Sequence, residues 1–338
     1  MADRIPIAID TLGGDNGPVY FVRGAMEGLK QNRNVKLFLV GNKEQLEGLV
    51  AEYDDYDRDR LEIVPSTEVI GCDEPPVEAI RKKKDSSLAV GLRLVKEGQA
   101  KALISAGSSG AVLAGGQFIV GRAKGVKRAP LVMPIPTSEG HSLLLDCGAN
   151  VDAKPEVLRQ FAVMGSIYME NLFGVKNPTV GLVNIGAEDE KGNALVKATL
   201  PLLRECNNIN FAGSIEARDI PFGKTDVVLA EAFTGNVIIK LYEGLSKMIL
   251  SELKNACMKG PKEKLGGLLI KKSLKSTVSA FDASDKGGAP LLGLKGLVVK
   301  IHGNSKNGEV RSAIRQCRQY VQSGVSEKIR KGLEENDI

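Results

Sequence analysis

Short apolar runs alternate along this chain with stretches of helical periodicity. The first run, 5–9, leads into glycines and small polar residues and then into helical spacing at 19–29. Similar runs follow at 35–41, 61–64, 102–105, 142–145, 179–184, 211–214, 226–229 and 297–301. Short apolar strands separated by helices are typical of a mostly parallel sheet with helices on both faces. The pattern therefore predicts an α/β fold of three layers, α/β/α.

The domain organisation is simple, because no linker, repeat or low-complexity segment interrupts the alternation. The chain has 338 residues, of which 43% are hydrophobic, and this is enough to bury a large core. We expect a single two-lobed domain over residues 4–335, with a helical tip at about 240–282.

The composition narrows the classes of partner and location. A net charge of +5, an aromatic content of 4% and the absence of Trp give no indication of nucleic-acid binding. Five scattered cysteines lack the spacing of a metal site and are typical of reduced thiols. No signal peptide precedes the first strand, and no apolar run approaches the ~20 residues of a membrane span. We expect a cytoplasmic protein, or one that lies on a membrane surface.

Glycines and polar residues follow most of the predicted strands. In a parallel sheet these positions meet at one edge, where ligands bind. They are Asp10, Gly13 and Gly14; Ser105, Gly107, Ser108 and Ser109; Asn150 and Lys154; Asn184, Glu188 and Lys191; and Thr234 and Asn236. Glycine-rich turns that enter helices present backbone N–H groups, which favour phosphate or another oxyanion. Turn formation and helix capping are the alternative explanation for about half of these residues.

Several common active-site patterns are missing. The sequence has no P-loop, no G-x-G-x-x-G after the first strand and no G-x-S-x-G. Two histidines, His141 and His302, are too few for a His-rich metal site. Cys147 follows His141 closely, but it stands at a strand end where a small buried residue is expected. The remaining N–H groups, hydroxyls, amides and lysines suit chemistry that holds and uses phosphate without a covalent intermediate.

Many ordered segments are similar to those of a known family. They are AIDTLGGDNGP (8–18), CDEPPVEAIRKKKDSS (72–87), ISAGSSGA (104–111), LLLDCGANVDAKPEVLRQFAVMG (143–165), GLVNIGAEDEKGN (181–193), NFAGSIEARDI (210–220), EAFTGNVIIK (231–240), GGAPLLGLKG (287–296) and IHGNS (301–305). Through them the chain resembles, nearly end to end, the PlsX-type phosphate acyltransferases of bacterial fatty acid and phospholipid synthesis. The resemblance implies an isocitrate/isopropylmalate-dehydrogenase-like fold, shared with phosphate acetyltransferases, and usually a homodimer.

The same resemblance implies an activity. An acyl group would pass from acyl carrier protein to orthophosphate, and the acyl phosphate would feed a membrane glycerol-3-phosphate acyltransferase. No metal, nucleotide or other cofactor is implied. The strand-end residues and His302 would then bind phosphate and substrate, with Lys191, Asn236 and Asn184 as the catalytic candidates.

The residue types fit this chemistry, since phosphate is already an anionic nucleophile and needs orientation more than deprotonation. Glycine-rich N–H groups near Gly13, Gly107 and Gly186 can orient it, and such positioning supplies up to ~7–11 kcal/mol. Lys191 and Asn236 are the candidate donors to the thioester oxyanion. As alternatives, Asn236 caps the following helix and Lys191 pairs with Glu188 or Asp189. Asp146, Asp152 and Lys154 equally suit an ion-pair network.

Other function classes remain open from the sequence. A short-chain phosphate acyltransferase that uses acyl-CoA is the nearest alternative within the enzyme class. A β-decarboxylating dehydrogenase of similar fold would need a metal-binding Asp cluster and a nicotinamide pocket, and neither signature is present. A non-catalytic module that binds a carrier protein or a membrane would not explain the polar residues at the strand ends.

Two surface segments predict partners. A basic helix from Pro75 carries Arg81, Lys82, Lys83 and Lys84, a candidate contact for the acidic acyl carrier protein, although charge runs are usually solvated faces. An apolar island of Leu265, Leu268, Leu269 and Ile270 lies between lysines and predicts binding to an anionic membrane surface. An oligomer contact is the alternative for the island. A second stripe, Ile270, Leu274, Val278 and Phe281, is expected to pack on protein or on a dimer mate.

Overall fold

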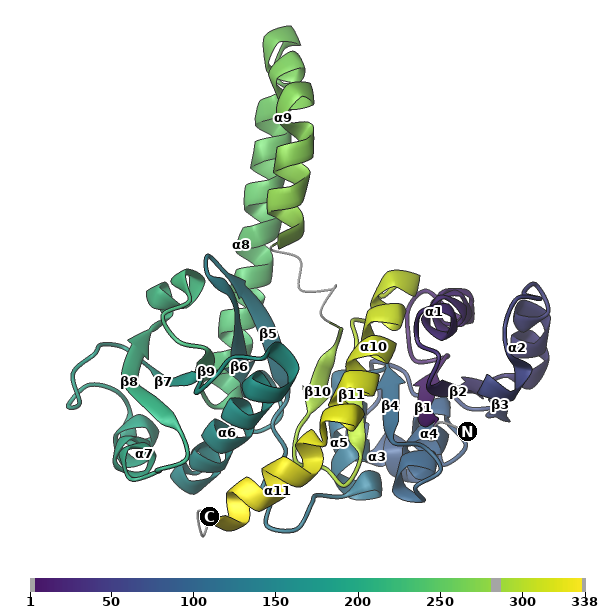
Figure 1. Cartoon of the computed structure of the whole chain (residues 1–338), viewed down its shortest axis with the longest axis horizontal. Coiled ribbons are helices and arrows are strands. Elements are labelled where there is room, and N and C mark those ends of the chain that lie inside the picture. The colour runs from purple at the N-terminus through teal and green to yellow at the C-terminus, as the bar shows by residue number, and fades with distance from the viewer. Residues whose placement is uncertain (1–3, 281–286, 336–338) are drawn as a thin grey trace.

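The computed structural model describes residues 4–280 and 287–335, with only the backbone described for 275–280. Its strands form two sheets, one in each lobe (Figure 1). The first sheet has the order β10-β11-β4-β1-β2-β3 and is parallel except for β10. Its strands are β1 (Ile5–Asp10), β2 (Val35–Gly41), β3 (Leu61–Pro65), β4 (Ala102–Ser105), β10 (Ala289–Leu291) and β11 (Leu297–Lys300).

The second sheet has the order β5-β6-β9-β7-β8, and β5 alone runs antiparallel to its neighbour. Its strands are β5 (Val132–Thr137), β6 (Gly140–Leu145), β7 (Thr179–Asn184), β8 (Asn210–Glu216) and β9 (Val227–Leu229). The predicted α/β class with mostly parallel strands is confirmed, and the strands are divided between two sheets. Two strands were missed: β5 contains two prolines, which only an edge strand tolerates, and β10 has three residues.

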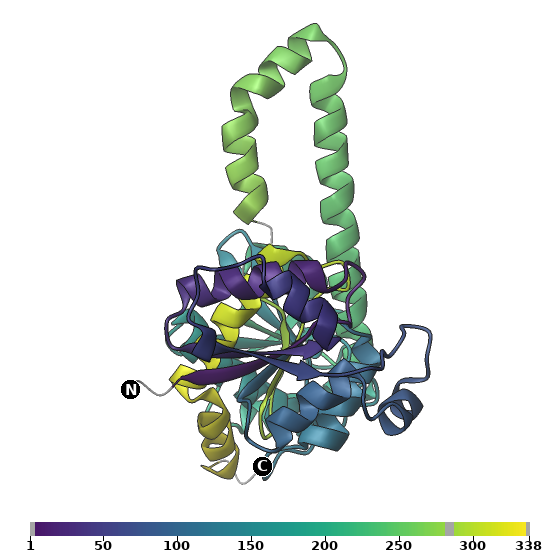
Figure 2. The same ribbon diagram turned by 90° about the vertical axis from the view of Figure 1, so that its right-hand side faces the viewer.

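Helices cover both sheets and connect them (Figures 1 and 2). The first lobe contains α1 (Pro18–Gln31), α2 (Lys43–Val50), α3 (Pro76–Lys82), α4 (Ser87–Lys96) and α5 (Ser109–Gly115), and the second contains α6 (Pro155–Tyr168) and α7 (Ala194–Arg204). From the C-terminal part, α10 (Asn307–Ser323) packs on α1 and α11 (Val325–Glu335) packs on α6. Gln316 of α10 donates to the hydroxyl of Tyr168, the last residue of α6 (3.1 Å). Helices α10 and α11 therefore tie the two lobes to one another.

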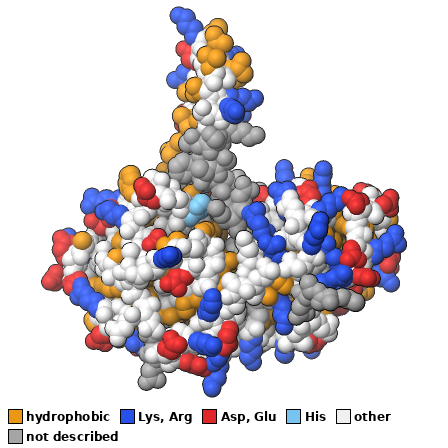
Figure 3. Space-filling view, viewed as in Figure 1, with side chains coloured by type: hydrophobic (Ala, Val, Ile, Leu, Met, Phe, Trp, Pro, Cys, Tyr) orange, Lys and Arg blue, Asp and Glu red, His pale blue; other side chains and the backbone are white. Residues whose placement is uncertain are grey.

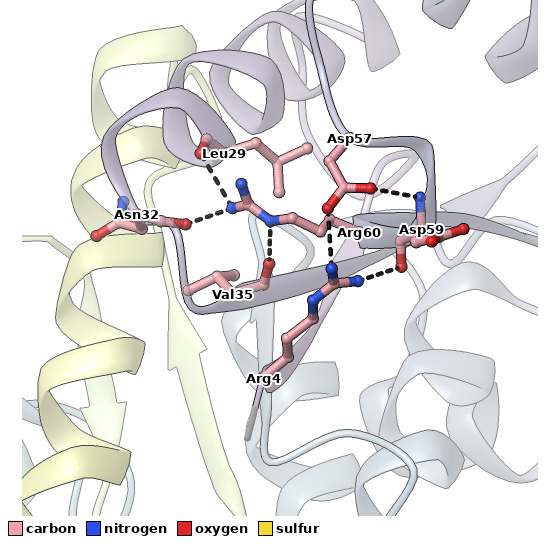
Figure 4. A network of polar contacts seen from close by, with 7 residues as sticks. All are labelled: Arg4, Leu29, Asn32, Val35, Asp57, Asp59 and Arg60. Carbon is pink, nitrogen blue, oxygen red and sulfur yellow. Dashed lines mark hydrogen bonds and ion pairs between the residues drawn. The ribbon is translucent and has the colours of Figure 1, made fainter. Parts of the chain in front are cut away.

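Arg60 fastens the outer edge of the first sheet to the end of α1 (Figure 4). Its guanidinium donates to the carbonyls of Val35 (2.9 Å), Leu29 (3.0 Å) and Asn32. Two of these carbonyls belong to the last turn of α1 or follow it, where no backbone N–H is available for them. A short 3₁₀ helix, Arg58–Arg60, places this guanidinium just before β3.

The basic segment is shorter as a helix than predicted. Helix α3 ends at Lys82, and Lys83 folds back, donating to Glu74 (2.7 Å) and to the carbonyl of Val69 (2.8 Å). Lys82 pairs with Glu78 along the helix. Arg81 and Lys84 are exposed, so the cationic surface available to a partner is smaller than the sequence suggested.

A long helical hairpin projects from the body between the lobes (Figures 1 and 2). Helix α8 (Ala232–Met258) has 27 residues and α9 (Pro261–Ala280) has 20, so α8 is about 40 Å long. Residues 240–280 of the predicted tip belong to this hairpin, which starts at Ala232, whereas residues 281–282 lie outside the described residues. None of the described helices is long and apolar enough to cross a membrane.

Candidate active site

The carboxyl ends of β1, β4 and β11 lie side by side in the first sheet. The pairing register aligns Asp10 with Ser105 and Ser105 with Lys300. Asp10 is fully buried and accepts bonds from the hydroxyls of Ser87 and Ser105, both at 2.6 Å. It also accepts from the amide of Gly13 at 3.1 Å. Asp10 thus acts as the anchor of its loop, and its burial keeps it from direct contact with a ligand.

The predicted phosphate-binding amides of this edge are largely occupied. The Gly13 amide is bonded to Asp10, and the Gly107 amide donates to the Ser105 hydroxyl at 3.0 Å. A Cβ on Gly13 would lie 2.4 Å from the Asp10 carboxylate and 2.8 Å from the Gly107 nitrogen. Glycine is required there because the two loops touch through their backbones. The amides of Gly13 and Gly107 thus bond within the loops in this structure, and their contact with phosphate stays a prediction.

A similar anchor stands in the second sheet at the end of β6. The buried carboxylate of Asp146 accepts from the amides of Gly148, Ala149 and Asn150, and from that of Leu131. Burial raises the pKa of Asp146, while these donors act in the opposite direction. Asn150 also donates its side-chain amide to Asp146 at 2.7 Å. An ion-pair network with Asp152 and Lys154 is not seen among the described contacts, in which amides surround Asp146.

Helix α8 begins against this loop. Glu231 is its N-cap and accepts from the amides of Phe233 (2.5 Å) and Thr234 (3.0 Å), and from the Thr234 hydroxyl. A Cβ on Gly235 would lie 1.9 Å from the Asp146 carbonyl oxygen, so only glycine allows this approach. Asn236 lies in the second turn, where it does not cap the helix, and its exposed side chain faces the space between the lobes.

That space contains a cavity of about 330 Å³, which we call the polar cavity. Both lobes contribute to it: Ser109 from α5, Gly148 after β6, Asn236 and Lys240 from α8, and Lys300 and His302 from the end of β11. The structure thus brings together Ser109, Asn236 and His302 of the predicted site residues. Sequence reasoning missed Lys300 and Lys240, although Lys240 is the last residue of the segment 231–240 and Lys300 directly precedes the segment 301–305.

Lys300 occupies the centre of this arrangement. Its ammonium donates to the carbonyls of Ala106 (3.3 Å) and Ile301, and of its three N–H groups this leaves one for a ligand. The pKa of Lys300 is lowered to about 8, mainly by burial and to a smaller extent by the positive charge of Lys240. Cys72, Asp15 and Asp10 act in the opposite direction. Within residues 4–280 and 287–335, no carboxylate forms an ion pair with this ammonium.

His302 stands next to Lys300 and is exposed. Its Nδ1 accepts from the amide of Asn304 at 3.3 Å. This bond favours the neutral tautomer with the proton on Nε2, which leaves Nε2–H as a donor for a ligand in the cavity.

A second cavity, of about 400 Å³, adjoins the polar cavity and shares Met133, Ile239, Glu243, Lys300 and His302 with it. We call it the α8 groove. It continues along α8 and is lined by Pro134, Pro136, Tyr242, Ser246 and Leu250. The groove also carries Lys247 and Glu309, so both cavities combine apolar walls with a few charged side chains, and they meet at Lys300 and His302 at the end of β11.

The remaining predicted residues lie outside both cavities. Lys191 is exposed and pairs with Glu188 at 3.0 Å, the alternative arrangement that the sequence left open. Asn184 is buried at the end of β7 and donates to the Ser214 hydroxyl (3.2 Å) and to the Lys191 carbonyl (3.3 Å). The other residues are Gly14, Ser108 and Lys154, which line neither cavity.

Cys147 lines the polar cavity but is buried, and its thiol donates to the Leu131 carbonyl at 3.0 Å. Burial raises the pKa of Cys147 well above its ordinary value, and the neighbouring Asp146 adds to this effect. A thiol in this environment is not a ready nucleophile. The sequence expectation of a small buried residue at this strand end is confirmed.

Comparisons with known proteins identify the family of this chain. The family described as "Fatty acid synthesis protein" matches residues 5–328. A phosphate acyltransferase of Clostridium botulinum (strain Alaska E43 / Type E3) is 45% identical over 332 residues, which cover 98% of this chain and 99% of that protein. A phosphate acyltransferase of Alkaliphilus oremlandii is 46% identical over 327 residues, 97% of each chain.

Solved structures show the same fold at low sequence identity. A phosphotransacetylase from Streptococcus pyogenes has a TM-score of 0.63 at 18% identity and covers 94% of each chain. A 4-hydroxythreonine-4-phosphate dehydrogenase from Klebsiella pneumoniae has a TM-score of 0.52 at 11% identity, covering 95% of this chain and 99% of that one. Fold and site define a two-lobed α/β protein of the type shared by phosphotransacylases and these dehydrogenases. Within that class, the chain belongs to the fatty acid synthesis family of PlsX-type phosphate acyltransferases, which confirms the resemblance.

Proposed function

We propose that this protein transfers a fatty acyl group from acyl carrier protein to orthophosphate. The observation that carries the proposal is the junction of the polar cavity with the α8 groove at Lys300 and His302. An acyl thioester has a polar reacting centre and an apolar chain, and this junction places the polar groups of Lys300 and His302 next to apolar walls. The 43–46% identity to phosphate acyltransferases supports the phosphate acceptor.

The side chains at the junction suit acyl transfer to phosphate. In its protonated form Lys300 attracts the phosphate dianion, with Lys240 as a second cation on the wall. An oxygen of the hydrogen phosphate dianion attacks the thioester carbon and forms the new C–O bond, the C–S bond breaks, and the proton that the phosphate loses passes to the departing thiolate. Asn236 and His302 Nε2–H are the neutral donors available to the carbonyl oxygen as its negative charge develops.

Lys191, the catalytic residue expected from the sequence, retains a proposed role. It lies on the loop after β7 next to Asn184, whose side chain bonds to its carbonyl. Its partner Glu188 is exposed, so the pair is weak and an anionic substrate can displace the carboxylate. On this proposal Lys191 acts on the bound substrate complex, whereas Lys300 is already in place in the free protein.

Acyl carrier protein is the proposed donor, with Arg81 and Lys84 as its contacts. Both are exposed, and neither is among the basic side chains that α3 and its flank already pair internally. An acidic carrier would be attracted to this surface, and the attraction would weaken with salt. Coenzyme A, the alternative donor, would not depend on these two residues in the same way.

The hairpin is the proposed membrane contact, and the protein is proposed to work as a homodimer beside a membrane glycerol-3-phosphate acyltransferase. Leu265, Leu268, Leu269 and Ile270 are 52–77% exposed, and exposed lysines flank them (Figure 3). Apolar side chains among lysines suit insertion at an anionic bilayer surface. In the second stripe, Leu274 is half-buried, whereas the side chains of Val278 and Phe281 lie outside the described residues.

A donor comparison tests the proposal. The purified protein is incubated with phosphate and with the same acyl group on either acyl carrier protein or coenzyme A, and acyl phosphate is measured as its hydroxamate. We expect a higher kcat/KM with the carrier protein. Equal or better use of acyl-CoA would establish the alternative donor, and no acyl phosphate from either donor would refute the proposed activity.

A further inference from the structure

The α8 groove is bounded by one face of α8 and by the edge strand β5. Ile239, Tyr242, Ser246 and Leu250 line it from the helix, spaced three, four and four residues apart. This is the spacing at which side chains share one helical face. From Ile239 to Leu250 that face extends for about 16 Å along the helix axis.

The opposite wall is unusually poor in hydrogen-bonding groups. It is built by Met133, Pro134 and Pro136 of β5, and the two prolines carry no backbone N–H. The Tyr242 hydroxyl donates to the Pro136 carbonyl at 3.0 Å, which satisfies that carbonyl and fixes the helix against the strand. This wall therefore presents apolar surface to a ligand, while Glu243, Lys247 and Glu309 line other parts of the groove.

The groove has a defined chemical direction. At its inner end it reaches Lys300 and His302, where it joins the polar cavity. At its outer end it reaches Ser246, the exposed Lys247 and Leu250, whose apolar side chain is 39% exposed. A ligand with one polar end and a linear apolar chain matches this polarity, with the polar end at β11 and the chain along α8.

We propose that the α8 groove holds the acyl chain of the substrate, with the thioester at Lys300 and the methyl end at Ser246 and Leu250. This inference rests on the proposed function and adds where the chain lies and what limits its length. Each methylene that the groove buries strengthens binding by about fourfold. Chain-length preference is therefore set by the outer end of the groove and not by the reacting centre.

A chain-length profile tests the inference. The kcat/KM is measured for acyl donors from butyryl to stearoyl, on the wild type and on the variants Ser246→Phe and Ser246→Leu. A bulkier residue at the outer end should lower kcat/KM for stearoyl by about 15-fold, the equivalent of two displaced methylenes, and leave butyryl within about twofold. Circular dichroism shows whether each variant folds. If Ser246→Phe does not fold, Ser246→Leu is used in its place.

Leu245→Phe is the matched control, because Leu245 is a neighbour on α8 that is 44% exposed and lines neither cavity. Its profile should match the wild type. A folded Ser246 variant with an unchanged profile, or with equal losses for all donors, would overturn the inference. A wild type that forms no acyl phosphate from any donor would instead refute the proposed function.

Discussion

Replacement of Lys300 by methionine should stabilise the protein near neutral pH while it removes activity. Burial lowers the pKa of Lys300 from 10.5 to about 8, which corresponds to about 3 kcal/mol against the charged form in the folded protein. Methionine has a similar length and no charge, so it avoids this cost. Methionine also lacks the hydrogen bonds to the carbonyls of Ala106 and Ile301, and this loss cancels about 1–2 kcal/mol of the stabilisation. We expect a net gain of about 1–2 kcal/mol in the free energy of unfolding near pH 7.

The two pKa values of Lys300, folded and unfolded, determine how the stability difference changes with pH. Between the folded pKa of about 8 and the unfolded value of 10.5, the unfolded chain binds a proton that the folded chain does not. Wild-type stability from this group therefore rises with pH in that window, and the cost is fully present below it. The advantage of Lys300→Met should shrink by about 2 kcal/mol between about pH 7 and about pH 9.5.

Urea unfolding at several pH values measures the stability, and acyl phosphate formation on the same samples measures the activity. Lys101→Met is the matched control, since Lys101 is exposed just before the opposite end of β4. Turnover of Lys300→Met should fall by at least about 100-fold, as for loss of a charge-stabilising donor. A variant that is less stable at neutral pH, or whose stability difference does not change with pH, would refute the reasoning. So would near-normal turnover.

Three further predictions test the rest of the site. Lys191→Ala should lower turnover by at least about tenfold with an unchanged circular dichroism spectrum, and normal turnover in the folded variant would remove it from the mechanism. The double variant Arg81→Glu/Lys84→Glu should raise KM for acyl carrier protein in a salt-dependent way but leave KM for phosphate unchanged; equal effects on both would argue against this docking surface. Wild type should sediment with anionic vesicles and the variant Leu268→Glu/Leu269→Glu should not; equal sedimentation of the two would assign the hairpin to a protein contact.

Local patterns in the sequence were enough to predict the strands with continuous apolar runs and the α/β class. They were not enough for β5, where Pro134 and Pro136 break the usual strand composition. They also could not show that the strands divide into two sheets, because strand order depends on contacts between distant segments. Of the predicted site, Ser109, Asn236 and His302 do lie together on the polar cavity.

Lys300 shows why the remaining residues of the site could not be predicted from the sequence. In the sequence it follows an apolar run and resembles a residue at the end of a buried strand. Its importance comes from its register next to Ser105 and from its bond to Ala106, which is 194 positions away. A pairing across that distance leaves no local signal, and the lowered pKa follows only from the burial that the pairing causes.

In the glycine-rich loops, several backbone amides bond to side chains at the strand ends and so help to build the site. In both lobes an Asp at a strand end accepts the amides two and three positions ahead: Leu12 and Gly13 for Asp10, and Gly148 and Ala149 for Asp146. Donors that are satisfied by a carboxylate cannot also neutralise a phosphate dianion, and the carboxylates themselves repel it. Lys300 and Lys240 bring positive side-chain charge to the junction. On the proposed function, these loops hold the walls of the polar cavity in place, and the lysines supply the attraction for the acceptor.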